Sequence, residues 1–133
     1  MMRTDTSATA LHADFAGRTL KFELRIGEIG ELERRCNAGI GEIMVRLAAH
    51  RFFAHDIVET IRLGLIGGGL SQADAETLMR WNVFGRPLAE NLQLAGSILE
   101  AAVSGVPAPG NPAAEGANDA APETSPSSID PAA

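Results

Sequence analysis

Residues 16–33 read AGRTLKFELRIGEIGELE, and the hydrophobic period changes within this stretch. From residue 18 to residue 26, apolar and charged or polar residues alternate, which is the pattern of a half-buried strand. From Gly27 onward the apolar residues follow the i, i+3, i+7 spacing of an amphipathic helix. These helical positions are Ile29, Leu32 and Cys36. The stretch therefore predicts a strand that leads directly into a helix.

A second, weaker strand is predicted upstream, over residues 10–15. Ala16 and Gly17 separate the two strands and can close a hairpin, with Gly17 supplying a positive φ if the turn needs one. A two-stranded hairpin is only marginally stable in water. We therefore expect helices to cover one of its faces.

Four more helices are predicted downstream. An apolar stripe runs through residues 40–47, another lies in residues 55–65, and the three glycines at 67–69 end the latter helix. Ser71, with Asp74 three residues later, predicts a helix start, and that helix extends through Trp81. Pro87 suits the first position of a fifth helix that ends near residue 103. The predicted fold is α+β: a short N-terminal β-hairpin packed on a bundle of about five short helices, forming one domain over residues 10–103.

The two ends of the chain differ from this domain in composition. Residues 1–9 are mainly polar, and we expect a flexible N-terminus. Residues 104–133 hold six of the seven prolines, four acidic residues and no basic residue. Such a segment buries too little apolar surface to offset the entropy of ordering, so we expect a disordered, Pro/Ala-rich acidic tail that proteases cut near residues 104–109. Without these four acids, residues 1–103 have 13 acidic and 11 basic residues, a net charge of −2.

Composition also limits the function classes. The net charge of the whole chain is −6, which disfavours binding to nucleic acid. Its single cysteine, Cys36, indicates no disulfide framework and suggests the cytoplasm. Neither an export signal nor an apolar run long enough to span a membrane is visible, so we expect no membrane partner.

No catalytic, metal or cofactor motif is complete. The glycines at 67–69 lack the Gly-Lys-Ser/Thr ending of a phosphate-binding loop. The helix over residues 71–82 is too acidic to serve as a DNA-reading helix. Cys36 lies on an apolar stripe and is expected to be a buried structural thiol, although a small enzyme that uses Cys36 or His55 is one alternative. We expect a protein that is not an enzyme and has no cofactor.

The chain has more large apolar residues than the helix stripes require. Either they fill the core, or some of them form a surface for a partner helix. The candidate partner-binding residues are Phe52, Phe53, Trp81, Phe84, Leu94 and Ile98.

The order of motifs resembles gene transfer agent family proteins, which are small phage-derived tail proteins. The resemblance starts with the run AGRTLKFELRIGEIGELE at residues 16–33, continues through Gly39-Ile40, residues 56–58 and residues 65–69, and covers roughly residues 15–103. Ala54-His55 stands where a Ser or Thr cap is common, so we expect fraying there, and the segment after Ser104 is longer than the usual ending.

This resemblance implies a phage-type tail assembly chaperone. Such a protein binds the tape measure protein and helps to recruit tail tube protein around it. The alternative is a structural tail component, a tube or completion subunit that stays in the particle. A homo-oligomer is compatible with either role.

Overall fold

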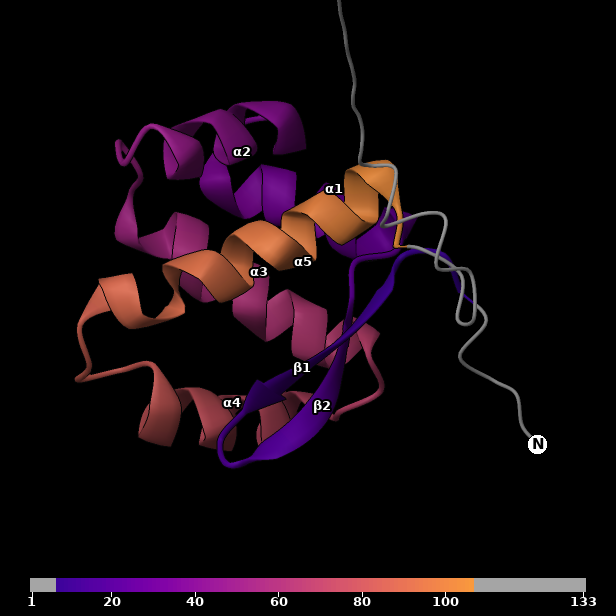
Figure 1. Cartoon of the computed structure of the whole chain (residues 1–133), viewed down its shortest axis with the longest axis vertical. Coiled ribbons are helices and arrows are strands. Elements are labelled where there is room, and N and C mark those ends of the chain that lie inside the picture. The colour runs from indigo at the N-terminus through magenta and orange to yellow at the C-terminus, as the bar shows by residue number, and fades with distance from the viewer. Residues whose placement is uncertain (1–6, 107–133) are drawn as a thin grey trace, which may run out of the picture.

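The predicted hairpin is present in the computed structural model, which describes residues 7–106 (Figure 1). Strands β1 (Ala10–Phe15) and β2 (Arg18–Glu23) are antiparallel, with Ala10 opposite Glu23 and Phe15 opposite Arg18. Ala16 and Gly17 both have positive φ, 58° and 80°, as a two-residue type I′ turn requires. The second strand ends three residues earlier than expected because the chain turns into the first helix at residue 26.

The five predicted helices are also present, and the fold is α+β. Their ends differ from the predicted ends by a few residues at most, except that the fifth helix is preceded by a short 3₁₀ turn, η1, that had not been expected. The side chain of Asn91, the last residue of η1, donates a hydrogen bond to the carbonyl of Asn82 at 3.4 Å, which ties this turn to the end of the preceding helix. The elements are α1 (Ile26–Cys36), α2 (Ile40–Ala48), α3 (Ala54–Gly67), α4 (Gln72–Asn82), η1 (Leu88–Asn91) and α5 (Leu92–Ser104).

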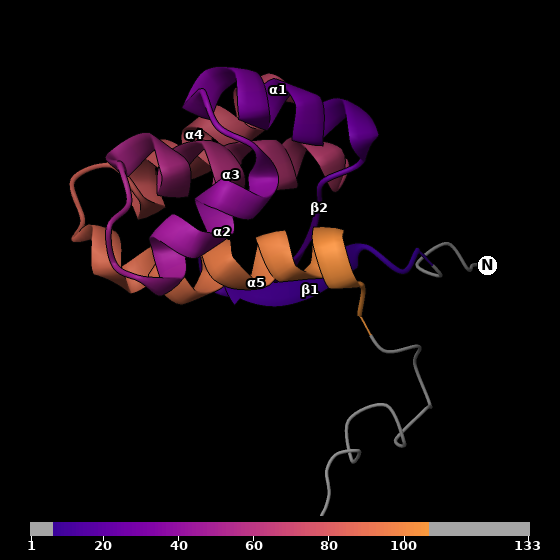
Figure 2. The ribbon, with the colours of Figure 1, turned by 90° about the horizontal axis from the view of Figure 1, so that it is seen from above.

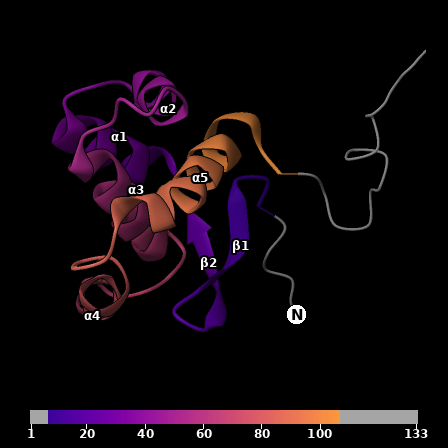
Figure 3. The same ribbon diagram turned by 60° about the vertical axis from the view of Figure 1, so that its left-hand side comes forward.

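Helix α3 is the centre of the packing. It contacts β2, α1, α4 and α5, and α5 in turn lies along the hairpin and beside α2 (Figures 2 and 3). The core therefore forms where β2 and the helices meet α3. Its fully buried large side chains include Phe22, Leu24, Leu32, Ile43, Ile57, Ile61, Leu65, Met79, Ile98 and Leu99.

Two glycines allow the end of α3 to lie directly against the backbone of β2. A Cβ atom on Gly67 would be 1.9 Å from the carbonyl oxygen of Glu23, and one on Gly68 would be 2.1 Å from that of Lys21. Only glycine fits this approach. The glycine run was predicted to end the helix, and it does, with Gly68 as the C-cap; its second role is to join α3 to the hairpin.

The two terminal segments predicted from composition lie mostly outside the described residues. Of the predicted N-terminal segment, residues 7–9 are described, and the hydroxyls of Ser7 and Thr9 donate hydrogen bonds to the carboxylate of Glu23 at 2.6 and 2.9 Å. Of the predicted tail, residues 104–106 are described, and Ser104 is the last residue of α5. Within residues 7–106, no helix has the length and the apolar character needed to cross a bilayer.

Candidate functional site

The six candidate partner-binding residues do not form one surface. Trp81 is 73% exposed and Phe84 39% exposed at the end of α4, whereas Phe53 is 57% exposed just before α3. Phe52 and Leu94 are half-buried and pack against the core. The sixth, Ile98, is only 1% exposed and belongs to the core, so it offers no surface to a partner.

Nearby side chains already contact two of the exposed aromatic rings. The guanidinium carbon of Arg46 lies 4.9 Å from the centre of the Phe53 ring, and His55 stacks on the same ring at 5.5 Å. The guanidinium carbon of Arg62 lies 6.0 Å from the centre of the Phe84 ring. Cation–π contacts of this kind hold the two rings at the surface.

A buried carboxylate holds the start of α3. Asp56 is fully buried, and its carboxylate accepts hydrogen bonds from Nη1 of Arg46 at 3.0 and 3.2 Å and from the backbone N–H of Phe53 at 2.8 Å. The sequence predicted fraying at this end because a Ser or Thr cap is missing. The structure adds that Asp56 supplies an acceptor from inside the first turn and that the helix starts at Ala54; fraying itself stays a prediction.

Cys36 lies next to this carboxylate. Burial, with a further contribution from the Asp56 carboxylate, raises the pKa of the Cys36 thiol to about 12. The thiol therefore stays protonated near neutral pH and does not supply the thiolate that nucleophilic or redox chemistry needs. Single ligand atoms of Cys36, His55 and Asp56 lie within 4.8 Å of one another, but the carboxylate already pairs with Arg46.

A second charged group links α1, α3 and α4 on the surface. Hydrogen bonds from Arg34, the larger contribution, and from Arg35 lower the pKa of Glu31 to about 2. Arg35 also pairs with Glu59 at 2.8 Å, and Arg62 pairs with Glu59 and, at 3.2 Å, with Glu76. Because these charges neutralise one another, the group is best explained as a link between helices.

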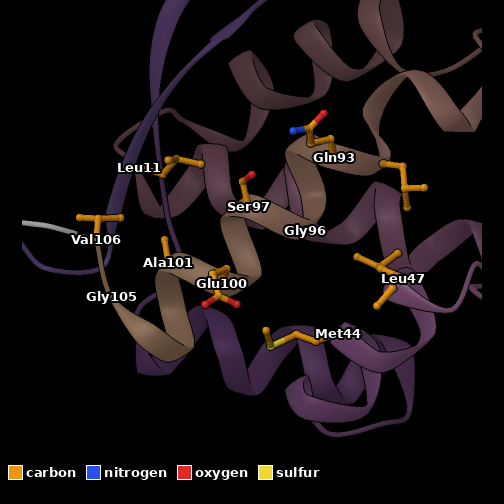
Figure 4. A pocket seen from close by; sticks show the side chains of 12 residues that line it. Leu11, Met44, Leu47, Gln93, Gly96, Ser97, Glu100, Ala101, Gly105 and Val106 are labelled. Atoms are coloured by element: carbon orange, nitrogen blue, oxygen red, sulfur yellow. The ribbon is translucent and has the colours of Figure 1, made fainter. Parts of the chain in front are cut away.

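An apolar groove of about 580 Å³ opens between α2 and α5, beside the start of the hairpin (Figure 4). Leu11 and Val106 lie on its β1 side, and Met44 and Leu47 on its α2 side. Helix α5 supplies most of the remaining lining. The complete lining is Leu11, Met44, Leu47, Ala48, Leu92, Gln93, Gly96, Ser97, Glu100, Ala101, Gly105 and Val106.

Glu100 differs from the rest of this groove. Among the described residues that line it, Glu100 alone is charged. It is exposed, and no ion pair or hydrogen bond joins its carboxylate to another residue within 7–106. The groove therefore combines apolar walls with one unneutralised negative charge.

Residues 8–105 match a family model described as phage tail tube protein, GTA-gp10. The chain belongs to this family. The matched span includes both strands, all five α-helices and every residue of the groove lining except Val106, and it confirms the resemblance to gene transfer agent proteins seen in the sequence. The comparisons with curated proteins and with solved structures gave no match. GTA-gp10 family membership identifies a protein of phage-type tails and indicates association with tail components.

The groove was not predicted from the sequence. None of its lining residues was among the six candidates, because the groove is formed by elements that are far apart in the chain. One signal was available in the sequence: Gly96 lies inside a predicted helix, where glycine is unfavourable and has no capping role. A Cβ atom at Gly96 would meet nothing within 4 Å, which is consistent with its position in an open groove.

Proposed function

We propose that this protein is a tail assembly chaperone of a gene transfer agent and that it binds the tape measure protein without covalent chemistry while the tail tube assembles. The α2–α5 groove is the observation that carries this proposal. A long helical protein with apolar stripes needs a partner that covers them, and an open apolar groove is a suitable surface for one such stripe.

The described site chemistry is compatible with a binding role. Burial keeps the Cys36 thiol protonated. The charged side chains around Asp56 and Glu59 form ion pairs with one another, so no substrate is needed to explain why these charges lie together. The proposed place of action is the cytoplasm, which the single cysteine of the chain favours.

Co-expression with the tape measure protein tests the proposal. We expect the chaperone to raise the soluble fraction of the tape measure protein and to be recovered with it in a pull-down. Unchanged solubility together with no recovery would refute the chaperone function. A variant at an exposed position that is neither in the groove nor among the six candidate residues, such as Arg80→Ser, provides a control for effects of expression level.

A structural tail component is the second candidate, and the family description favours it because it names a tail tube protein. Mass spectrometry of purified particles separates the two functions. A tube or completion subunit is present in a fixed ratio to other tail proteins, whereas a chaperone is absent or far below that ratio.

A further inference from the structure

The exposed face of α5 is shaped to receive another backbone closely. Gln93, Gly96, Ser97 and Glu100 follow the i, i+3, i+4, i+7 spacing of one helix face, and all four line the groove (Figure 4). Two of them are small, and the Cβ position of Gly96 faces open space. The apolar walls formed by Leu11 and by the α2 side chains stand on either side of this face.

The length of the groove fits a short piece of helix. Its lining on α5 extends from Leu92 to Ala101, which corresponds to about 14 Å at the rise of an α-helix. That distance matches about two and a half turns of a partner helix. Apolar side chains at three successive i, i+3 or i+4 positions of such a helix fit within it.

The charge of the groove indicates the sign of its partner. The unpaired carboxylate of Glu100 lies in the lining, and Val106, from which the chain continues, lies at the rim. The 27 residues that follow Val106 contain four acidic residues and no basic residue. Negative charge on the wall and on the segment that starts at the rim attracts a cationic partner and repels an acidic one.

The same charges argue against the protein's own C-terminal segment as the occupant. That segment is acidic like Glu100, and Ile129 is its only large apolar residue. It therefore lacks both the opposite charge and the row of apolar anchors that the groove calls for.

We propose that the α2–α5 groove binds one face of a basic amphipathic helix, with apolar side chains against the half-buried Leu11, Met44 and Leu92 and with a lysine or arginine beside Glu100. This proposal rests on the proposed function in that the tape measure protein is the expected source of the helix. The chemistry of the helix follows from the groove itself.

Two labelled peptides of about 18 residues, long enough to form a helix on binding, provide the probe. Both have the same leucine face; one has lysines on its polar face and the other has glutamates. Binding to the full-length protein is measured by fluorescence anisotropy. We expect the lysine peptide to bind at least tenfold more tightly, and we expect higher salt to reduce this difference.

Gly96→Leu tests the location. Leucine at this position fills open groove space and removes a helical glycine, so the variant is expected to fold at least as stably as the parent and to bind the lysine peptide at least tenfold more weakly. Gly30→Leu is the matched control, because Gly30 is also a helical glycine with no atom within 4 Å of its Cβ position, but it lies in α1, outside the groove. This control is expected to bind like the parent.

Glu100→Lys tests whether the negative charge of the groove selects a basic partner. Glu100 is exposed, so this second variant is expected to fold like the parent. We expect it to weaken binding of the lysine peptide by about threefold to tenfold and to strengthen binding of the glutamate peptide. Equal binding of both peptides to the parent, or equal weakening by Gly96→Leu and Gly30→Leu, would overturn the proposal.

A second copy of the chain as the occupant gives a different result. In that case neither peptide binds and Gly96→Leu lowers the molar mass measured by light scattering, which would also overturn the proposal. If neither peptide binds but co-expression makes the tape measure protein soluble, binding of a basic helix at the groove is refuted and the chaperone function stands. If the lysine peptide binds as expected but co-expression has no effect on the tape measure protein, the chaperone function is refuted and binding of a basic helix at the groove stands.

Discussion

Gly67→Ala is predicted to destabilise the protein, although alanine is the better helix former. Gly67 is the last residue of α3, and local propensity alone favours alanine there by about 0.5–1 kcal/mol. The contact with β2 has the opposite effect. A Cβ atom at this position would be 1.9 Å from the carbonyl oxygen of Glu23, whereas ordinary contact begins at 3.4 Å.

The size of the effect follows from what must move. The Glu23 carbonyl belongs to the backbone, so β2 itself has to move away by about 1.5 Å, and no side-chain rotation relieves the clash. This end of the hairpin carries Phe22 and Leu24, each of which is buried by at least 99% and stabilises the fold by about 1.5–3 kcal/mol. Partial loss of both contacts, added to the overpacking cost, gives a decrease of about 3 kcal/mol in the free energy of unfolding. For a domain of this size, that corresponds to a Tm lower by about 12–24 °C.

Thermal and urea unfolding followed by circular dichroism measure this change. Gly30→Ala is the control, because Gly30 lies within α1 and has no atom within 4 Å of its Cβ position. The control is expected to be more stable than the parent by about 0.5–1 kcal/mol. If Gly67→Ala shifts the Tm in the same direction as Gly30→Ala, the close approach of α3 to β2 does not exist as described and the reasoning is refuted.

Four further predictions concern other parts of the fold. Ala16→Asn is expected to raise the free energy of unfolding by about 0.5–1 kcal/mol in urea titrations, because asparagine tolerates the positive φ of a type I′ turn better than alanine does. Asp56→Asn is expected to lower it by about 1–3 kcal/mol, since it removes the charge of a fully buried carboxylate that accepts hydrogen bonds from Arg46 and from the backbone N–H of Phe53. Cys36 is expected to react with iodoacetamide at pH 8 far more slowly in the folded protein than in urea; equal rates would contradict its burial and its raised pKa. Glu31 contributes stability that is present above its ordinary pKa of 4.5 and is lost as the pH falls toward about 2, so Glu31→Gln is expected to flatten the fall in Tm over that range.

The sequence predicts the local elements well because their signals are local. The alternation in residues 18–26 places Phe22 and Leu24 on the buried face, and the structure confirms it for these two residues. The prediction is wrong for Ile26, which is 85% exposed because the strand ends at Glu23 and helix α1 begins at Ile26. Ser71 was expected to cap the fourth helix, and its hydroxyl accepts the backbone N–H of Asp74 at 3.1 Å. Each of these features depends on residues a few positions apart, which periodicity and capping rules describe directly.

Features that need distant segments could not be predicted in the same way. Gly67 was interpreted as a helix stop, because its contact with the Glu23 carbonyl depends on how α3 packs against β2. Ile98 was a candidate for partner binding, yet its helix face turns toward the core once α5 packs on α3. The groove also depends on distant segments, since Leu11 of β1 and Met44 of α2 line one groove together with residues of α5.

The position of the groove relative to the core is compatible with reversible binding of a partner. The core centres on α3, whereas Gln93, Gly96, Ser97 and Glu100 lie on the outer face of α5, so a partner can enter or leave the groove without disturbing the packing that holds the fold together. A groove of about 14 Å accommodates only about two and a half turns of a partner helix, whereas stable complexes typically bury 1,200–2,000 Å². A chaperone has to release its client once the tube forms, and a short groove with one charge contact suits that requirement. A subunit retained in a particle needs a larger contact than a groove of this length, so the structural alternative requires further contact surface outside the groove.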